Sequence, residues 1–314
     1  MRPELIQATE LLRRNTPEAV AEAIGLLQGT VYSFSMKVCG HPEDAEDTMQ
    51  EVLFRSLAHL AKIQEPQALA VWLYTVTRNR CWRMRRKSVH APKHMLSLEE
   101  LMPDAAELGR LLADVAAGPE DNLLHAEQHH LLHQAVLRIP AQLRIVLVLH
   151  DMEELNTEQV AQILGLQTGT VRVRLHRARL AVRKEMSRVL DEAQPNGPDA
   201  QADAGQKKKR RTPSKESGSA SQQHPRECSE LFAGLSEYLD GRVETRTCAE
   251  MNEHIAACPA CVAFLRDLRQ AIDRCRTFEV SCDPAVAQRL RSMLTQEYLR
   301  MIAVPAMKQV SPVL

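Results

Sequence analysis

Four residues near the C-terminal end of the chain have the types and the spacing of a zinc site. His254 precedes Cys258 by one helical turn, and Cys258 and Cys261 stand on either side of the dipeptide Pro259-Ala260. Imidazole nitrogen and thiolate sulfur are donors that Zn²⁺ prefers, and structural zinc sites hold the ion with four protein ligands. Cys228 can supply the fourth donor. We therefore predict a site with three cysteines and one histidine that holds one Zn²⁺ and ties down a small core.

The CxxC pair within this group has two other interpretations, a redox-active pair of thiols and two inert cysteines. Redox pairs of this spacing are typical of a βαβ unit, and the surrounding sequence shows no such pattern. The zinc site is therefore the favoured hypothesis. Three further thiols are either buried apolar side chains or resolving cysteines of a redox switch: Cys248, Cys275 and Cys282. A row of histidines at i+4 spacing is interpreted as a solvated helix flank rather than a second metal site: His125, His129 and His133.

A second group of residues has the pattern of a helix-turn-helix. Asn156 and Gln159 form a capping pair for a first helix, and Gly165 suits the left-handed position of the turn. A second helix follows, which we expect Thr168 to cap. Recognition helices contact base edges mainly with their N-terminal residues, while later arginines hold phosphates. The candidates for DNA contact are Thr170, Arg172, Val173, His176 and Arg177.

A basic, aromatic helix is expected earlier in the chain. Residues 72–90 hold six Lys and Arg side chains and no acid, and three aromatic rings stand among them, Trp72, Tyr74 and Trp82. Cations that hold phosphates, together with rings that stack on unpaired bases, are typical of single-stranded nucleic-acid binding. The alternative is a core helix with solvated arginines. We expect both in part, with Trp72 in the core and the C-terminal arginines on phosphates.

An acidic helix comes before this basic one. Residues 43–51 contain five acids and no base. Asp44, Asp47 and Glu51 fall at i, i+3 and i+7, which is one stripe of a helix, and Gln50 lies beside them. An isolated stripe of this kind is most simply a solvated face. Because the basic aromatic helix follows at once, we interpret the acidic stripe as a candidate binding surface.

Helices must position all of these residues. Apolar residues recur at i, i+3 and i+4, only 4% of the residues are aromatic, and no sustained period-2 alternation occurs, so we predict an all-α protein. Thr16-Pro17-Glu18 starts a helix that Gly40 ends, and another helix begins at Pro42. The expected organisation is a helical block at 1–87, an acidic linker at 88–121, a helix-turn-helix block at 122–192, a flexible basic linker at 193–226, a zinc-binding block at 227–303 and a tail at 304–314.

The composition limits the class of protein. With 314 residues, the chain is long enough for two or three compact units. Its 40 Lys and Arg balance 40 Asp and Glu, and a net charge of zero by itself disfavours a nucleic-acid partner. The basic residues are concentrated in separate segments, however, so the net charge does not exclude such a partner. No apolar run reaches the roughly 18 to 20 residues of a membrane helix, and the N-terminus lacks the apolar core of a secretory signal. We therefore expect a cytoplasmic protein without membrane contact, whose cysteines are reduced.

Two segments resemble domains of bacterial RNA polymerase sigma factors of the extracytoplasmic-function (ECF) type. The promoter-melting domain of that family is similar to DAEDTMQEVLFRSLAHL, WLYTVTRNR and the RMRRK tail. Its −35-binding domain is similar to RIPAQLRIVLVLHDMEELNTEQVAQILGLQTGTVRVRLHRAR. The resemblance implies that four side chains dock on the β′ clamp of core RNA polymerase: Asp44, Asp47, Gln50 and Glu51. It also implies that three side chains lie along the −10 strand of promoter DNA: Arg78, Asn79 and Arg83.

The C-terminal block resembles a zinc-binding anti-sigma domain in its pattern C…YLDG…H-x₃-C-x₂-C. In that family such a domain clamps between the two sigma domains, and here it stands on the same chain as its target. The resemblance implies an intramolecular contact, for which residues 284–303 offer an apolar helix face. We expect a sigma factor regulated in cis, with no catalysis of its own. The alternative is a helix-turn-helix repressor with a metal- or redox-sensing tail, which needs neither the acidic nor the aromatic helix.

Overall fold

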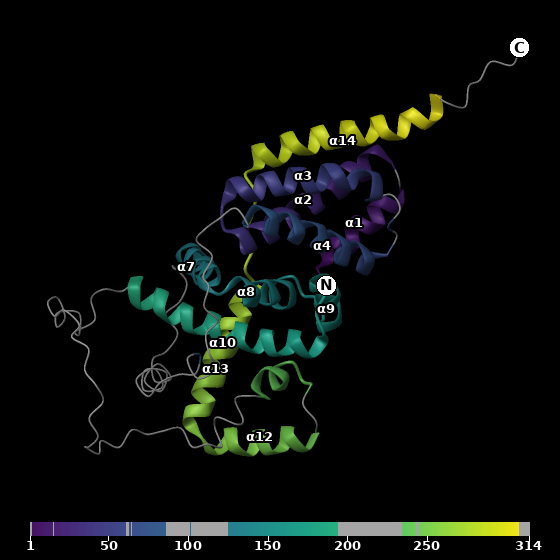
Figure 1. Ribbon diagram of the computed structural model, residues 1–314. Coiled ribbons are helices and arrows are strands. Elements are labelled where there is room, and N and C mark those ends of the chain that lie inside the picture. The colour runs from purple at the N-terminus through teal and green to yellow at the C-terminus, as the bar shows by residue number, and fades with distance from the viewer. Residues whose placement is uncertain are drawn as a thin grey trace, which may run out of the picture. The chain divides into compact units, whose positions relative to one another are not determined.

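A computed structural model describes residues 2–14, 16–60, 63, 65–85, 101, 125–193, 234–242 and 245–307. Every regular element in these ranges is helical, which confirms the prediction of an all-α protein (Figure 1). Cys228 and nearly all of the two predicted linkers lie outside the described residues. Within the described ranges, no helix is long and apolar enough to cross a membrane. The chain forms two compact units.

The first unit draws its helices from three parts of the chain, within residues 1–95, 136–178 and 273–314. Its central helix packs against most of the others. The elements are α1 (Pro3–Arg14), the central α2 (Pro17–Cys39), α3 (Pro42–Leu60), α4 (Pro66–Arg85), α8 (Ala141–Leu147), the π-helical turn η1 (Val148–Met152), α9 (Thr157–Leu164), the first part of α10 (Thr168–Ala193) and α14 (Pro284–Met307).

Local signals set the ends of α2, as the sequence predicts. Thr16 accepts a hydrogen bond from the Ala19 amide at 3.3 Å, and Pro17 opens the helix. Gly40 ends it in the left-handed conformation with φ of 85°, donating to the Met36 carbonyl at 2.9 Å. The next helix, α3, follows directly at Pro42.

The core of the first unit lies between α2, α3 and α4. Burial of each large apolar side chain there contributes about 1.5–3 kcal/mol to stability. Because the apolar side of α3 faces α2, its acidic stripe is turned outward. Side chains that are at most 1% exposed include Ile24, Leu27, Phe34, Met49, Leu53, Leu57 and Leu73.

A buried charged cluster joins the helix-turn-helix segment to α1, α2 and α4 within this unit. The Glu153 carboxylate, just after η1, forms an ion pair with Lys37 at 2.8 Å and accepts a hydrogen bond from the Tyr74 hydroxyl at 2.7 Å. The Arg2 guanidinium adds a second ion pair to Glu153 at 3.0 Å. Burial lowers the pKa of Lys37 and, with the neighbouring carboxylate, raises that of Tyr74 well above its usual value.

The helix-turn-helix has the predicted local structure. Asn156 accepts from the Gln159 amide at 2.8 Å, and the Gln159 side chain accepts from the Asn156 amide at 3.0 Å, so the capping box is confirmed. Gly165 takes the left-handed turn position with φ of 65°. Thr168 is the first helical residue of α10 rather than its cap, because the Gln167 carbonyl accepts from the Val171 amide.

Glu154 has a positive φ of 56°, although only glycine adopts this region without cost. We expect Glu154→Gly to raise the free energy of unfolding by about 0.5–1 kcal/mol, because glycine adopts the left-handed region without backbone strain. Urea unfolding measures this change. As a matched control, Glu158→Gly, at an exposed position of α9, should lower stability instead. Equal effects of the two changes would contradict the assignment of strain to Glu154.

The second unit holds Cys248, Cys258 and Cys261. Its elements lie within residues 96–135 and 179–272: most of α7 (His125–Arg138), the second part of α10, a helical turn at 234–239, α12 (Thr245–Ala257) and most of α13 (Pro259–Arg276). Gly241 ends the turn with φ of 66°. The buried apolar side chains include Leu235, Met251, Phe264, Leu268 and Ile272.

Candidate metal centre and nucleic-acid interface

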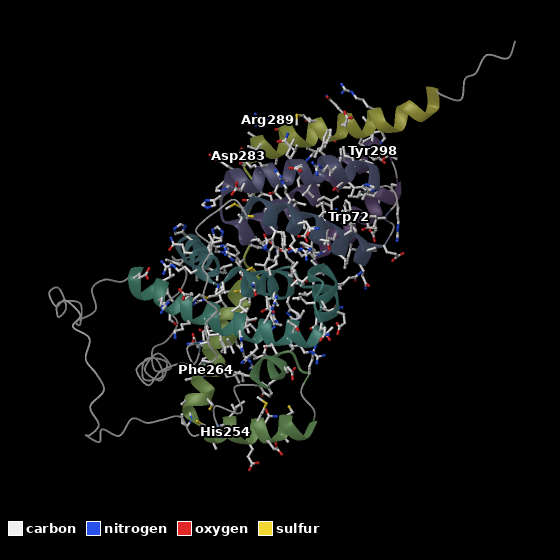
Figure 2. All side chains as sticks on the ribbon, in the orientation of Figure 1. Trp72, His254, Phe264, Asp283, Arg289 and Tyr298 are labelled. Carbon is white, nitrogen blue, oxygen red and sulfur yellow. The ribbon has the colours of Figure 1, made fainter. Side chains whose placement is uncertain are left out.

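Three of the four predicted zinc ligands come together where α12 meets α13. The ligand atoms of His254, Cys258 and Cys261 all lie within 4.8 Å of one another, and His254 Nε2 is 3.3 Å from Cys261 Sγ. Figure 2 labels His254 at this junction. Ligands at 2.0–2.3 Å from a tetrahedral zinc lie roughly 3.5–3.8 Å apart, so the three donors fit the ion. Cys228, the predicted fourth ligand, lies outside the described residues.

The short break between the two helices produces this convergence. The amide of Cys258 donates to the His254 carbonyl at 3.0 Å, which completes the last turn of α12. The Cys258 carbonyl then accepts from the Val262 amide at 3.1 Å and begins α13. Pro259 opens the second helix, where its missing amide hydrogen costs nothing. The backbone therefore places one ligand before the break, one within it and one after it.

The remaining cysteines and histidines of the described ranges lie apart from this cluster. Among the described residues, no other group of three His, Cys, Asp or Glu side chains converges as a metal site. His129 is exposed and His133 is half-buried, while the side chain of His125 is not described. Burial raises the pKa of Cys282, and Glu46 and Asp283 add to the rise, which disfavours its reactive thiolate. Cys275 is buried, and Cys248 accepts a hydrogen bond from Asn252 at 3.7 Å.

The acidic stripe of α3 is largely accessible. Asp47 and Gln50 are exposed and Asp44 is half-buried. Glu51 is engaged within the unit, with ion pairs to Arg80 of α4 at 2.6 Å and to Arg55 at 3.0 Å.

One further candidate on this stripe does not stand out from the charge pattern of the sequence. Phe54 is 57% exposed, and it follows Asp47 by seven residues and Gln50 by four. This spacing is the signal that could have placed it there. The stripe therefore combines acids with one exposed aromatic ring.

Several side chains of the basic aromatic helix α4 contact other parts of the first unit. The Arg78 guanidinium donates to the Ile163 carbonyl at the end of α9, donates to Asn79 Oδ1 and lies 5.8 Å from the Trp82 ring centroid. Burial lowers the pKa of Arg78. Tyr74, which sequence analysis grouped with the base-stacking aromatics, is a core residue hydrogen-bonded to Glu153. Trp82 remains 37% exposed, whereas Trp72, the aromatic residue expected in the core, is half-buried.

The predicted DNA contacts of α10 differ in accessibility. Arg172 and Val173 are exposed, Thr170 and Arg177 are half-buried, and His176 is only 8% exposed. His176 can therefore contact a base only if the groups that bury it in this structure move away. The side chain of Arg83, the third predicted −10 contact on α4, is not described.

Two later arginines of α10, expected to hold phosphates, are buried in the second unit. Arg179 forms an ion pair with Asp240 at 2.8 Å and donates to the Ser236 hydroxyl at 2.8 Å. Arg183 forms an ion pair with Asp267 at 3.2 Å. Both contacts are made to the segment that also carries the cluster of His254, Cys258 and Cys261.

Comparison with known proteins assigns a family to each of these parts. The family models described as sigma-70 region 2 and sigma-70 region 4 match residues 24–90 and 129–182, and a zinc-finger model matches residues 228–261. These matches follow one another in the order that the sequence predicts.

Individual proteins are similar to this chain over about half of its length. The chain is 30% identical over 174 residues to the RNA polymerase sigma-E factor of Streptomyces coelicolor, covering 54% of this chain and 88% of that protein. It is 26% identical over 176 residues to the ECF RNA polymerase sigma factor SigW of Bacillus subtilis, covering 56% and 92%. A solved sigma factor from Bartonella quintana, in complex with the anti-sigma factor NepR, is similar at 20% identity with a TM-score of 0.37, covering 52% and 92%.

Proposed function

The chain belongs to the ECF family of RNA polymerase sigma factors, and from this premise we propose that its C-terminal zinc-binding region regulates sigma activity in cis. The family directs core RNA polymerase to promoters and starts transcription, without catalysing a reaction itself. The observation that carries the regulatory proposal is the packing of α14, the helix after the zinc-finger match, along α2 and α3 of the sigma region 2 match (Figure 1).

The contact of α14 is close and specific. The Gln28 side chain of α2 donates to the Ala287 carbonyl at 3.1 Å. Gly25 faces Arg291 so closely that a Cβ would lie 2.8 Å from its guanidinium carbon. Leu290, Leu294 and Tyr298 recur every four residues and are at most 5% exposed, so one face of α14 is buried. Because Asp47 and Gln50 stay exposed, α14 does not cover the acidic stripe itself. Packed on the same helix, it can hinder the polymerase sterically beside the stripe.

The residues of each interface are proposed in the same terms. Residues 1–87 form the promoter-melting block, in which Asp44, Asp47, Gln50 and Glu51 dock on the β′ clamp and Arg78, Asn79 and Arg83 meet the −10 strand. Residues 122–192 form the −35-binding block, with base contacts from Thr170, Arg172, Val173, His176 and Arg177. Residues 227–303 form the regulatory block, which holds one Zn²⁺ through Cys228, His254, Cys258 and Cys261. Linkers at 88–121 and 193–226 join them in a cytoplasmic protein. The exposure of Asp47, Gln50, Arg172 and Val173 supports these assignments.

Disrupting the packed face of α14 tests the regulation. We expect Leu294→Asp in the full chain to tighten binding to core polymerase about tenfold, because a carboxylate buried at this position carries a desolvation cost of several kcal/mol that releases the helix. Affinity for core enzyme and transcription from a cognate promoter measure the effect. Met293→Asp introduces the same charge at a neighbouring position that is 48% exposed, and it should change neither quantity.

A shorter chain gives an independent comparison. A chain ending at Ala193 has a span similar to that of the relatives, and it should bind core polymerase at least as tightly as Leu294→Asp does. Weaker binding by the shortened chain, or equal binding by all four proteins, would remove the proposal of inhibition in cis while leaving the family membership intact.

A further inference from the structure

Four cationic or titratable side chains form a single row along α10. Arg172, His176, Arg179 and Arg183 are spaced by four, three and four residues. At 3.6 residues per turn, they lie within about 60° of one another around the helix. The first two are predicted DNA contacts, so the row continues the DNA-facing side of the recognition helix toward its C-terminal half.

The two arginines in the C-terminal half of this row are buried and donate hydrogen bonds to oxygen atoms of the protein. Arg179 is 1% exposed, and its guanidinium donates to the Ser236 carbonyl at 3.2 Å, to the Ser236 hydroxyl at 2.8 Å and to Asp240 at 2.8 Å. Arg183 is also 1% exposed, pairs with Asp267 at 3.2 Å and lies 4.8 Å from the Phe264 ring centroid. The covering groups come from the turn at 234–239, the residues just after it, and α13.

These contacts have the chemistry of a phosphate site. A guanidinium binds a carboxylate and a phosphate through the same fork of N–H donors, and each of these acceptors brings a negative charge. Arginine is almost never fully buried unless it is paired, so the two carboxylates are what allows these side chains to be covered. A DNA backbone offers the same charge and the same acceptor oxygens in their place.

We infer that Arg179 and Arg183 are phosphate-binding residues of α10, and that Asp240, Ser236 and Asp267 occupy them in place of the DNA backbone. The C-terminal region and DNA then compete for one row of the recognition helix. This inference rests on the proposed regulation in cis. It adds that the C-terminal region weakens DNA binding, as an effect separate from its effect on polymerase binding.

Binding of the full chain to a labelled 30-base-pair DNA duplex of mixed sequence, without polymerase, tests the competition. The double variant Asp240→Asn/Asp267→Asn keeps the side-chain shapes and removes both charges. We expect it to bind the duplex at least tenfold more tightly at low salt. The slope of log affinity against log salt should steepen by about two, which corresponds to two new phosphate contacts.

Arginine variants then identify the contacts. In the double-variant background, Arg179→Ala and Arg183→Ala should each remove about one unit of the gained slope. Arg188→Ala is the matched control, because Arg188 is an exposed arginine on another side of α10, where it pairs with Glu185 at 2.9 Å. It should leave the gained slope unchanged, and an equal loss from all three variants would overturn the assignment.

Hydrogen exchange of the protein without substitutions tests the same competition, even if the variants do not fold. Saturating duplex should increase amide hydrogen exchange in residues 234–242, because DNA displaces them from α10. Unchanged exchange under saturation, or unchanged DNA affinity of a folded double variant, would overturn the inference. If Leu294→Asp still tightened binding to the polymerase in that case, regulation in cis would stand and only its action on DNA would fall.

Discussion

Glu153→Ala is expected to lower the free energy of unfolding of the first unit by about 3–5 kcal/mol. The change removes the acceptor of Lys37 and Tyr74 and the ion-pair partner of Arg2. Lys37 and Glu153 have fully buried side chains, so the lysine charge would be left in the interior without its counter-charge. Leaving one charge of a buried pair uncompensated costs more than the pair contributes when both charges are present.

Chemical unfolding followed by far-ultraviolet circular dichroism measures this loss. Glu158→Ala is the matched control: it removes a nearby acid, which is exposed, and should change stability by no more than about 0.5 kcal/mol. Glu153→Gln should fall between the two, because the amide oxygen can still accept from Tyr74 while the charge is lost. Equal stabilities of the two alanine variants would show that the cluster contributes nothing to the fold.

The second large effect is expected from the metal. The purified full chain should contain about one Zn²⁺, and His254→Ala or Cys258→Ala should lose it, because a structural site needs all four ligands. Structural zinc contributes about 10–16 kcal/mol of apparent binding energy in small domains, so its loss should unfold the segment around α12 and α13. Elemental analysis and amide hydrogen exchange in residues 245–272 report the two consequences separately.

Variants at other cysteines identify the ligand set. Cys228→Ala should lose the metal as His254→Ala does, which tests the ligand that lies outside the described residues. Cys248→Ala should keep it, because Cys248 lies outside the cluster of His254, Cys258 and Cys261. Retention of zinc by Cys228→Ala would assign the fourth ligand elsewhere, and a chain purified without metal would remove the zinc hypothesis altogether.

Loss of zinc also has an expected functional result. If the zinc-binding region acts in cis, chelation should raise transcription by the full chain and leave the chain ending at Ala193 unaffected. Equal activity of the full chain with and without chelator would separate the metal from the regulation, even if zinc were present.

Local sequence signals predicted the elements well because each depends on residues only a few positions apart. Thr16 and Gly40 cap the two ends of α2, and Asn156 and Gln159 form the capping box of α9. The predicted zinc ligands also depend on local spacing, because one helical break places His254, Cys258 and Cys261 together. Thr168 is the first helical residue of α10 and not the cap that the sequence predicts, because helix ends are uncertain by a residue or two.

Long-range pairs were not predictable in this way. Tyr74 has the sequence signature of a stacking aromatic, yet its hydroxyl is bound by a carboxylate 79 residues away. Arg78 carries the pattern of a DNA contact, but in this structure it donates to the carbonyl of Ile163. Nothing in the neighbourhood of either residue distinguishes a nucleic-acid partner from a protein one.

The sequence by itself therefore determined the helices, the order of the sigma regions and the cluster of one histidine and two cysteines, because propensity, capping and motif spacing act locally. Only the tertiary structure decided which charged side chains are paired with other groups of the protein. Arg179 and Arg183 have the same spacing whether they face a phosphate or the carboxylates of Asp240 and Asp267. A guanidinium accepts either oxygen anion, so its partner is set by which one the packing brings within hydrogen-bond distance.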